Sequence, residues 1–154
     1  MSQPDLERLG SELVVLSARL VRAVRRALEQ PTGVRTLSLL DEHGPSTVTQ
    51  LAQADRCSQP TMTGTVNVLV GHGWVRRTPH PADARSSLVE LTDEGRRLLA
   101  STRRGHGATV AERLARTNRF GTEELGTAVA LLREILDPPA GTQPDHPEKM
   151  KDSQ

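Results

Sequence analysis

Residues 47–92 read TVTQLAQADRCSQPTMTGTVNVLVGHGWVRRTPHPADARSSLVELT. The pattern predicts two short helices joined by a tight turn, at about 48–56 and 59–72, and then a two-stranded hairpin with a basic tip. Thr47 and Ser58 stand where helix-capping side chains belong. Such a helix pair can place one helix in a major groove of DNA while the hairpin reaches the flanking minor groove. A DNA-binding regulator is therefore the leading hypothesis.

The hairpin strands are expected at about 74–78 and 87–91. Residues 79–86 between them read PHPADARS, which looks too long for a two-residue turn and predicts an extended, proline-stiffened loop. The remaining segments predict helices, because apolar residues recur at helical spacing between capping and breaking residues. The fold class is thus mostly α with a small β-hairpin wing (α+β), with further helices at about 4–30, 35–43, 93–117 and 122–136.

The composition favours a soluble, cytoplasmic protein, and the expected DNA binding would place it on the nucleoid. No apolar run approaches the length of a membrane span, and the start of the chain does not resemble a signal peptide. The formal net charge is only +1, yet all 18 arginines precede residue 137 and both lysines follow it. Arginine suits phosphate and groove contacts because its planar fork donates two hydrogen bonds side by side.

The second helix of the pair carries the predicted base-reading surface. The N-terminal residues of such a helix meet base edges, where Gln and Asn can pair with adenine and Thr can contact thymine. The alternative is an ordinary polar helix face. Met62, Val66, Leu69 and Val70 form the predicted buried stripe. The DNA-facing candidates on and beside this helix are Ser58, Gln59, Pro60, Thr61, Thr63, Gly64 and Asn67.

The hairpin supplies the second set of candidates. Arg85 at the tip can enter a minor groove, where narrow A·T tracts concentrate negative potential. Asp83 can pair with Arg85, or with another arginine, and hold the loop. Arg76 and Arg77 on the first strand are expected to contact phosphates. The alternative is a solvated loop with incidental charge.

Other chemistry finds little support. The single cysteine, Cys57, excludes an intramolecular disulfide and is read as a small buried hydrophobe rather than a redox sensor. The five histidines show no metal-site spacing, so no metal and no cofactor are expected. We find no nucleophile–base pair or phosphate loop, which argues against an enzyme.

At this point the chain resembles a known family. Residues 57–63 (CSQPTMT), 73–75 (GWV), 83–85 (DAR) and 91–95 (LTDEG) are similar in order and spacing to the MarR family of bacterial transcription regulators. The resemblance covers about residues 5–136. Two positions depart from the family pattern: Gly64 stands where a basic residue is frequent, and Asn67 where an acid is frequent.

The resemblance implies a homodimeric winged helix-turn-helix repressor, or less often an activator. Many members of the family release DNA when they bind a small, often phenolic or lipophilic, molecule. We expect a pseudo-palindromic operator, with the two reading helices about 34 Å apart in successive major grooves. The alternative is a winged-helix protein-interaction module with no DNA target. The terminal helices also carry more apolar surface than the small winged helix-turn-helix region can cover, and a symmetric partner would bury it.

The expected domains and effector pocket follow from the same comparison. The pocket is expected between the dimerisation helices and the winged helix-turn-helix region. Its candidate lining residues, each of which by default would simply pack in the core, are Leu13, Leu16, Leu20, Leu37 and Leu40. The expected regions are a helical dimerisation region (1–34 and 93–136), a winged helix-turn-helix DNA-binding region (35–92) and a disordered tail (137–154).

Overall fold

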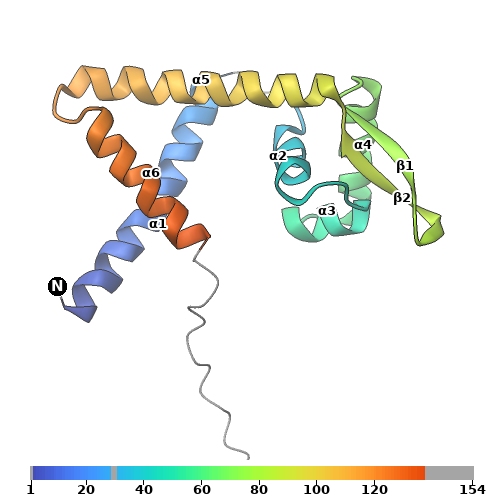
Figure 1. The fold of residues 1–154 in the computed structure, drawn as a ribbon, viewed down its shortest axis with the longest axis horizontal. Coiled ribbons are helices and arrows are strands. Elements are labelled where there is room, and N and C mark those ends of the chain that lie inside the picture. Colours follow the sequence, from blue (N-terminus) through green and yellow to red (C-terminus); the bar gives the residue numbers. More distant parts are fainter. Residues whose placement is uncertain (1, 29–30, 138–154) are drawn as a thin grey trace, which may run out of the picture. The chain divides into compact units, whose positions relative to one another are not determined.

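The computed structural model describes residues 2–28 and 31–137, apart from the side chain of Ala84. The chain divides into two compact units, residues 1–111 and 112–154. The predicted fold class, mostly α with a β-hairpin, is confirmed (Figure 1). The elements in chain order are α1 (Gln3–Ala27), α2 (Val34–His43), α3 (Val48–Asp55), α4 (Gln59–Gly71), β1 (Val75–His80), β2 (Asp83–Leu91), α5 (Asp93–Thr117) and α6 (Thr122–Leu136).

The helix pair α3–α4 begins and ends at the predicted caps. The Thr47 hydroxyl accepts from the Gln50 backbone N–H at 3.2 Å, and the Gln50 side chain accepts from the Thr47 backbone N–H at 2.8 Å. Arg56 then leaves the helical conformation with a φ of 54°, which ends α3. The Ser58 hydroxyl accepts from the Thr61 backbone N–H at 3.3 Å and starts α4.

The core of the first unit lies among α2, α3, α4, the hairpin and the start of α5, which Figure 1 shows gathered together. On α4 the predicted stripe of Met62, Val66 and Leu69 is fully buried, but Val70 is 40% exposed and the prediction was wrong for it. The three buried residues lie four and three positions apart, and Val70 lies one position further around the helix. The buried cluster consists of Val34, Leu37, Leu40, Leu51, Ala52, Met62, Val66, Leu69, Val75, Val89, Leu91 and Leu99.

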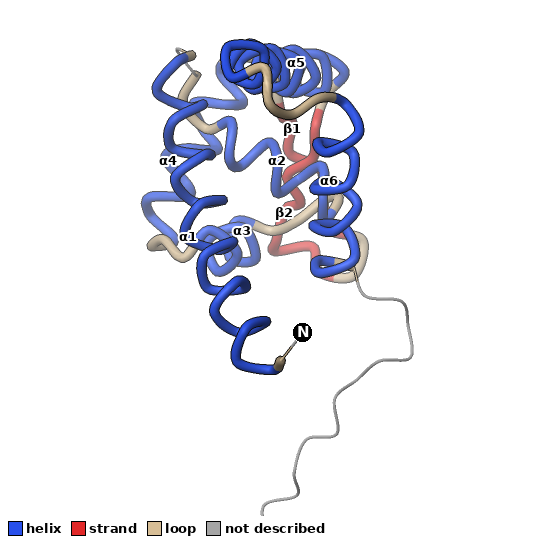
Figure 2. The backbone as a smooth tube through the Cα atoms, turned by 90° about the vertical axis from the view of Figure 1, so that its left-hand side faces the viewer, coloured by secondary structure: helices blue, strands red, loops and turns tan. Residues whose placement is uncertain are grey.

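The hairpin is longer than its sequence suggested. The antiparallel register runs from Val75 opposite Leu91 to Pro79 opposite Ser87, and His80 pairs with Asp83 after an irregularity. The predicted eight-residue loop is therefore wrong, and only residues 81–82 turn the chain (Figure 2). Pro79 and His80 are adjacent on β1, whereas residues 84–86 lie between Asp83 and Ser87 on β2, so the irregularity takes up three extra residues of β2. Such a break in the pairing tolerates proline, which has no N–H to donate.

Hydrogen bonds of Thr92 connect the base of the hairpin to the start of α5. The Thr92 hydroxyl donates to the Gly73 carbonyl at 2.6 Å and accepts from the Gly95 backbone N–H at 3.1 Å. A Cβ on Gly95 would lie 2.0 Å from the Trp74 carbonyl oxygen. The motifs at 73–75 and 91–95 therefore form one contact, in which glycine is needed because two backbones touch.

The terminal helices leave apolar side chains uncovered. α1 ends at Ala27, short of the predicted residue 30, because Leu28 adopts an extended backbone. Within the first unit α1 exposes Leu6, Leu9, Val14, Val15, Leu16, Leu20 and Val21. Within the second unit α6 exposes Leu125, Val129, Leu131, Leu132, Ile135 and Leu136.

Two further predictions concern the rest of the chain. No helix in the described ranges is both long and apolar enough to cross a bilayer. The tail predicted to be disordered lies outside the described residues from position 138 onward.

Candidate nucleic-acid interface

Helix α4 presents a polar face opposite its buried stripe. Ser58, Pro60, Thr61 and Gly64 are exposed, as are Gln59 and Asn67, and Thr63 is half-buried. No atom lies within 4 Å of where a Gly64 Cβ would stand, so a surface can approach the backbone closely there. The predicted base-reading residues thus share one accessible helix face.

Several of these polar groups already have partners within the protein. The Gln59 amide nitrogen donates to the Thr49 hydroxyl at 2.8 Å, which links α4 to α3. The Thr63 hydroxyl donates to the Gln59 carbonyl at 2.9 Å, and the Ser58 and Thr61 hydroxyls lie 2.7 Å apart. α4 also contains no charged residue. The face therefore carries no charge of its own, and its chemistry differs from that of a basic recognition helix.

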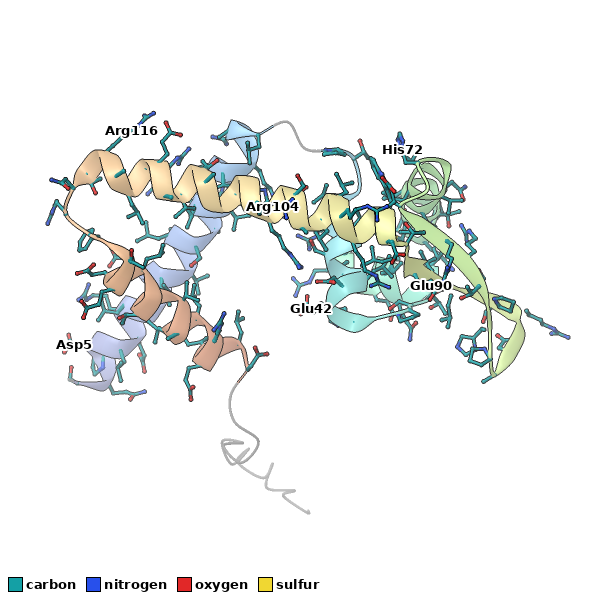
Figure 3. The ribbon with its side chains drawn as sticks, turned by 45° about the horizontal axis from the view of Figure 1, so that its top comes forward. Asp5, Glu42, His72, Glu90, Arg104 and Arg116 are labelled. Atoms are coloured by element: carbon teal, nitrogen blue, oxygen red, sulfur yellow. The ribbon has the colours of Figure 1, made fainter. Side chains whose placement is uncertain are left out.

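The two arginines on β1 differ from one another. The Arg76 Nε donates to Glu90 Oε1 at 2.6 Å, and this hydrogen bond, followed by the charge of Glu90, raises the pKa of the Arg76 guanidinium. The Arg77 Nη2 donates to Asn67 Oδ1 at 3.0 Å, and Asn67 is neutral. Figure 3 shows Glu90 on the hairpin. Arg77 therefore keeps its full charge beside α4, whereas Arg76 is paired with a carboxylate.

The hairpin tip is held by Asp83. Its Oδ1 accepts from the Arg85 backbone N–H at 2.9 Å, so Asp83 shapes the turn through the main chain and makes no salt bridge to the Arg85 guanidinium. The Ala82 backbone N–H donates to His80 Nδ1 at 3.2 Å. Arg85 itself is exposed, and within the described chain its guanidinium makes no ion pair. The tip is thus a fixed turn that carries one available cation.

Two partners in this site escaped the sequence analysis. Thr49 holds Gln59, and Glu90 holds Arg76. Glu90 could have been found, because Arg76 and Glu90 face each other in the hairpin register and opposite charges attract at such positions. Thr49 gave no such signal, since its contact with α4 depends on the angle between two helices.

A separate cleft of about 410 Å³ opens within residues 1–111, where α1, α2 and α5 meet. Its walls include Leu20, Val24 and Leu99, and Arg25 and Arg103 also line it. Arg103 Nη1 lies 2.8 Å from the carboxylate of Asp41. Because Arg103 is paired with Asp41, Arg25 is the arginine of this mostly apolar wall whose charge no such ion pair opposes, and the combination suits an apolar organic anion.

The predicted effector residues divide between this cleft and other places. Leu20 lines it, whereas Leu37 and Leu40 belong to the buried core. Leu13 is half-buried and Leu16 exposed on α1, and neither lines this cleft. Cys57 is half-buried against the core. In the described ranges, no group of three or more His, Cys, Asp or Glu could hold a metal ion.

A helix pair followed by a hairpin, with its second helix exposed and its hairpin tip basic, is a winged helix-turn-helix. The model of the MarR family matches residues 30–87. An HTH-type transcriptional regulator of Mycobacterium tuberculosis is 35% identical over 134 residues, 84% of this chain and 94% of that protein. The HTH-type transcriptional repressor NicR of Pseudomonas putida is 41% identical over 64 residues, 42% of this chain and 40% of that protein.

Solved structures agree on the fold. A mutant MarR from E. coli superposes with a TM-score of 0.65 at 23% identity, over 83% of this chain and 96% of that one. A transcriptional regulator from Pseudomonas aeruginosa gives 0.66 at 23% identity, over 89% and 99%. The chain belongs to the MarR family of transcription regulators. It is a regulator rather than an enzyme.

Proposed function

We propose that two copies of this chain form a homodimer that binds a pseudo-palindromic DNA operator and represses transcription. The observation that carries the proposal is that the exposed face of α4 and the cations Arg77 and Arg85 belong to one compact unit. A helix in the major groove and a basic wing beside it is how winged helix-turn-helix proteins contact DNA. The repressor NicR, similar over part of this chain, supports repression.

The uncovered helices support the dimer. α1 exposes Leu6, Leu9 and Leu16 at 45–48% each, and α6 exposes Ile135 and Leu136 at 55% and 75%. Apolar faces of this extent are unfavourable in water, and a symmetric copy buries both at once. Analytical ultracentrifugation at micromolar concentration should give twice the chain mass, and a single-chain mass would contradict the dimer.

DNA binding is tested with duplexes enriched from a genomic library by the purified protein. Arg85→Ala should weaken binding at least about tenfold while the circular dichroism spectrum stays unchanged. Arg8→Ala is the matched control, because Arg8 is exposed on α1 and lies 3.8 Å from Glu12 there. Equal affinity of the Arg85 and Arg8 variants would remove the wing from the interface.

The second candidate is a protein-interaction module. One observation favours it: α4 has no charge and exposes Val68 at 44% and Val70 at 40%. Affinity for DNA falls steeply with salt, and contact with about six phosphates gives a log–log slope near −5. Binding to a protein through the valines should be nearly independent of salt, and Val68→Ser should abolish it without affecting DNA.

We further propose that the α1–α2–α5 cleft takes the effector, a small apolar organic anion that releases DNA. Arg25 supplies the positive charge, and Leu20, Val24 and Leu99 supply the apolar wall. A series of substituted benzoates is the probe, read by thermal shift and by loss of DNA from the complex. Val110→Phe, at a half-buried lining residue outside the core cluster, should fill the cleft and leave DNA affinity unchanged while it prevents release.

A further inference from the structure

The second half of α1 carries a run of cations that the interface on α4 and the hairpin does not use. Residues 19–26 read RLVRAVRR, four arginines within eight residues, and no acidic residue occurs between positions 13 and 28. All four arginines are exposed. Side chains three, four or seven positions apart share one side of a helix, so Arg19, Arg22 and Arg26 form a single row, called the arginine row below. Arg25 lies outside the row and lines the α1–α2–α5 cleft.

The charge of the arginine row is not neutralised within the described ranges, where none of its three side chains makes an ion pair. Other exposed arginines of α1 and α5 lie 2.5–3.8 Å from a carboxylate one turn away on their own helix: Arg8 beside Glu12, Arg97 beside Glu94, and Arg116 beside Glu112. Like charges at the spacings of the row repel and destabilise a helix. An anionic partner would remove this repulsion.

The arginine row is separate from the apolar side of α1. At about 100° per residue, Leu13 and Val24 lie on the side of the helix opposite Arg26. Val24 is buried and Leu13 is half-buried, whereas the row is exposed. A partner copy that packs on the apolar side therefore leaves the row in solvent. Dimer formation and anion binding use different faces of α1.

The position and spacing of the row suit DNA. Residues of α1, α2 and α5 together line the cleft, so the second half of α1 packs on the winged helix-turn-helix region within one compact unit. α4 contains no charged residue, so the cations that bind phosphate must come from elsewhere. Arg19 and Arg26 are seven residues apart, about 10 Å along a helix. One DNA strand presents a phosphate about every 3.4 Å along its axis, so the row spans about three phosphates.

We infer that the arginine row is a second DNA-backbone site, in which Arg19, Arg22 and Arg26 bind phosphates outside the base contacts of α4. Guanidinium groups suit this role because their planar forks match phosphate oxygens. Such contacts add affinity without sequence preference. The inference rests on the proposed DNA binding and extends the surface that carries it.

The test compares two triple variants of the full chain that lose the same charge. The row variant combines Arg19→Gln, Arg22→Gln and Arg26→Gln. The control variant combines substitutions at the three arginines that have a carboxylate nearby: Arg8→Gln, Arg97→Gln and Arg116→Gln. Fluorescence anisotropy at several salt concentrations measures binding to the duplex enriched by the wild-type protein and to a random duplex.

The row variant should bind at least about tenfold more weakly than the control variant at about 50 mM salt. Its log–log salt slope should be flatter by about 2 to 5, because a dimer loses one to three phosphate contacts per protomer at about 0.9 each. The loss should be the same for the enriched and the random duplex. Ethylation interference should reveal phosphates whose modification weakens the wild type but not the row variant.

Folding and assembly are checked on the same samples. Glutamine is a good helix former and removes the repulsion, so the row variant should melt at the wild-type temperature or above and sediment as a dimer. A monomeric row variant would assign the row to the dimer interface and overturn the inference.

The remaining outcomes separate the two proposals. Equal salt slopes for the row and control variants would overturn the inference alone, and an acidic protein segment would become the partner to seek. Failure of the wild-type protein to enrich any duplex would overturn the proposed function itself.

Discussion

The two adjacent arginines on β1 should contribute unequally to DNA binding. Each phosphate contact that a protein loses lowers the log–log salt slope by about 0.9. Arg77 donates to two neutral side chains, Asn67 at 3.0 Å and Ser87 at 3.5 Å, and neither opposes its charge. Arg77→Ala therefore removes a full charge from each protomer and should lower the slope of a dimer by about 1.8. Between about 50 and 200 mM salt, its deficit relative to wild type should shrink about tenfold.

Arg76 should behave differently, because Glu90 lies 2.6 Å from its Nε and opposes its charge. Arg76→Ala should lower the slope by less than half as much as Arg77→Ala. Two further variants check the cause. Glu90→Gln leaves Arg76 unopposed and should steepen the slope. Asn67→Asp keeps an acceptor for Arg77 but adds a negative charge, and it should flatten the slope.

Fluorescence anisotropy with one labelled operator, at several potassium chloride concentrations, measures all five proteins. Circular dichroism confirms that each is folded. If Arg76→Ala and Arg77→Ala give the same slope, local pairing does not control the charge available to DNA and the reasoning fails. If neither changes the slope, β1 does not contact phosphate.

Three more predictions concern folding, each with its own measurement. Gly95→Ala should destabilise the protein by about 3 kcal/mol or more in urea unfolding, because the added Cβ would lie 2.0 Å from the Trp74 carbonyl oxygen. A loss of stability below about 1 kcal/mol would refute that close contact. Leu37→Ala, at a fully buried position, should cost about 2–5 kcal/mol in the same assay, and a smaller cost would mean that the core relaxes there. The backbone N–H of Gly121 donates to Glu124 at 2.7 Å and holds the pKa of this carboxyl below its ordinary value. This cap should therefore stabilise α6 at any pH above the ordinary glutamate pKa, and the stabilisation should be lost as the pH falls through the lowered pKa of Glu124. An NMR titration of Glu124 with a midpoint at or above the ordinary value would contradict this.

Local chemistry explains why much of the fold could be predicted from the chain alone. The caps at Thr47 and Ser58 lie where predicted, because a hydroxyl three residues before a free backbone N–H acts within one turn. The buried stripe of α4 followed from helical spacing. Val70 was misplaced, because the edge of a stripe depends on which neighbour covers it.

The hairpin loop was misjudged for a related reason. Two prolines and an apparent excess of residues suggested an open loop, yet the strands continue to His80 and from Asp83. An irregularity beside Pro79 takes up three extra residues of β2, and such breaks in pairing leave little trace in a single sequence.

The chain by itself determined the helix pair, the wing and the candidate residues on them, because caps, turn residues and apolar periodicity act over a few positions. Only the tertiary structure decided which hydrogen-bonding groups and charges of those residues already have a partner within the protein. It bound the Gln59 nitrogen to Thr49, opposed Arg76 with Glu90 and left Arg77 charged beside Asn67. These contacts join residues 10 to 14 positions apart, on different helices and strands, and their geometry follows from packing rather than from spacing along the chain.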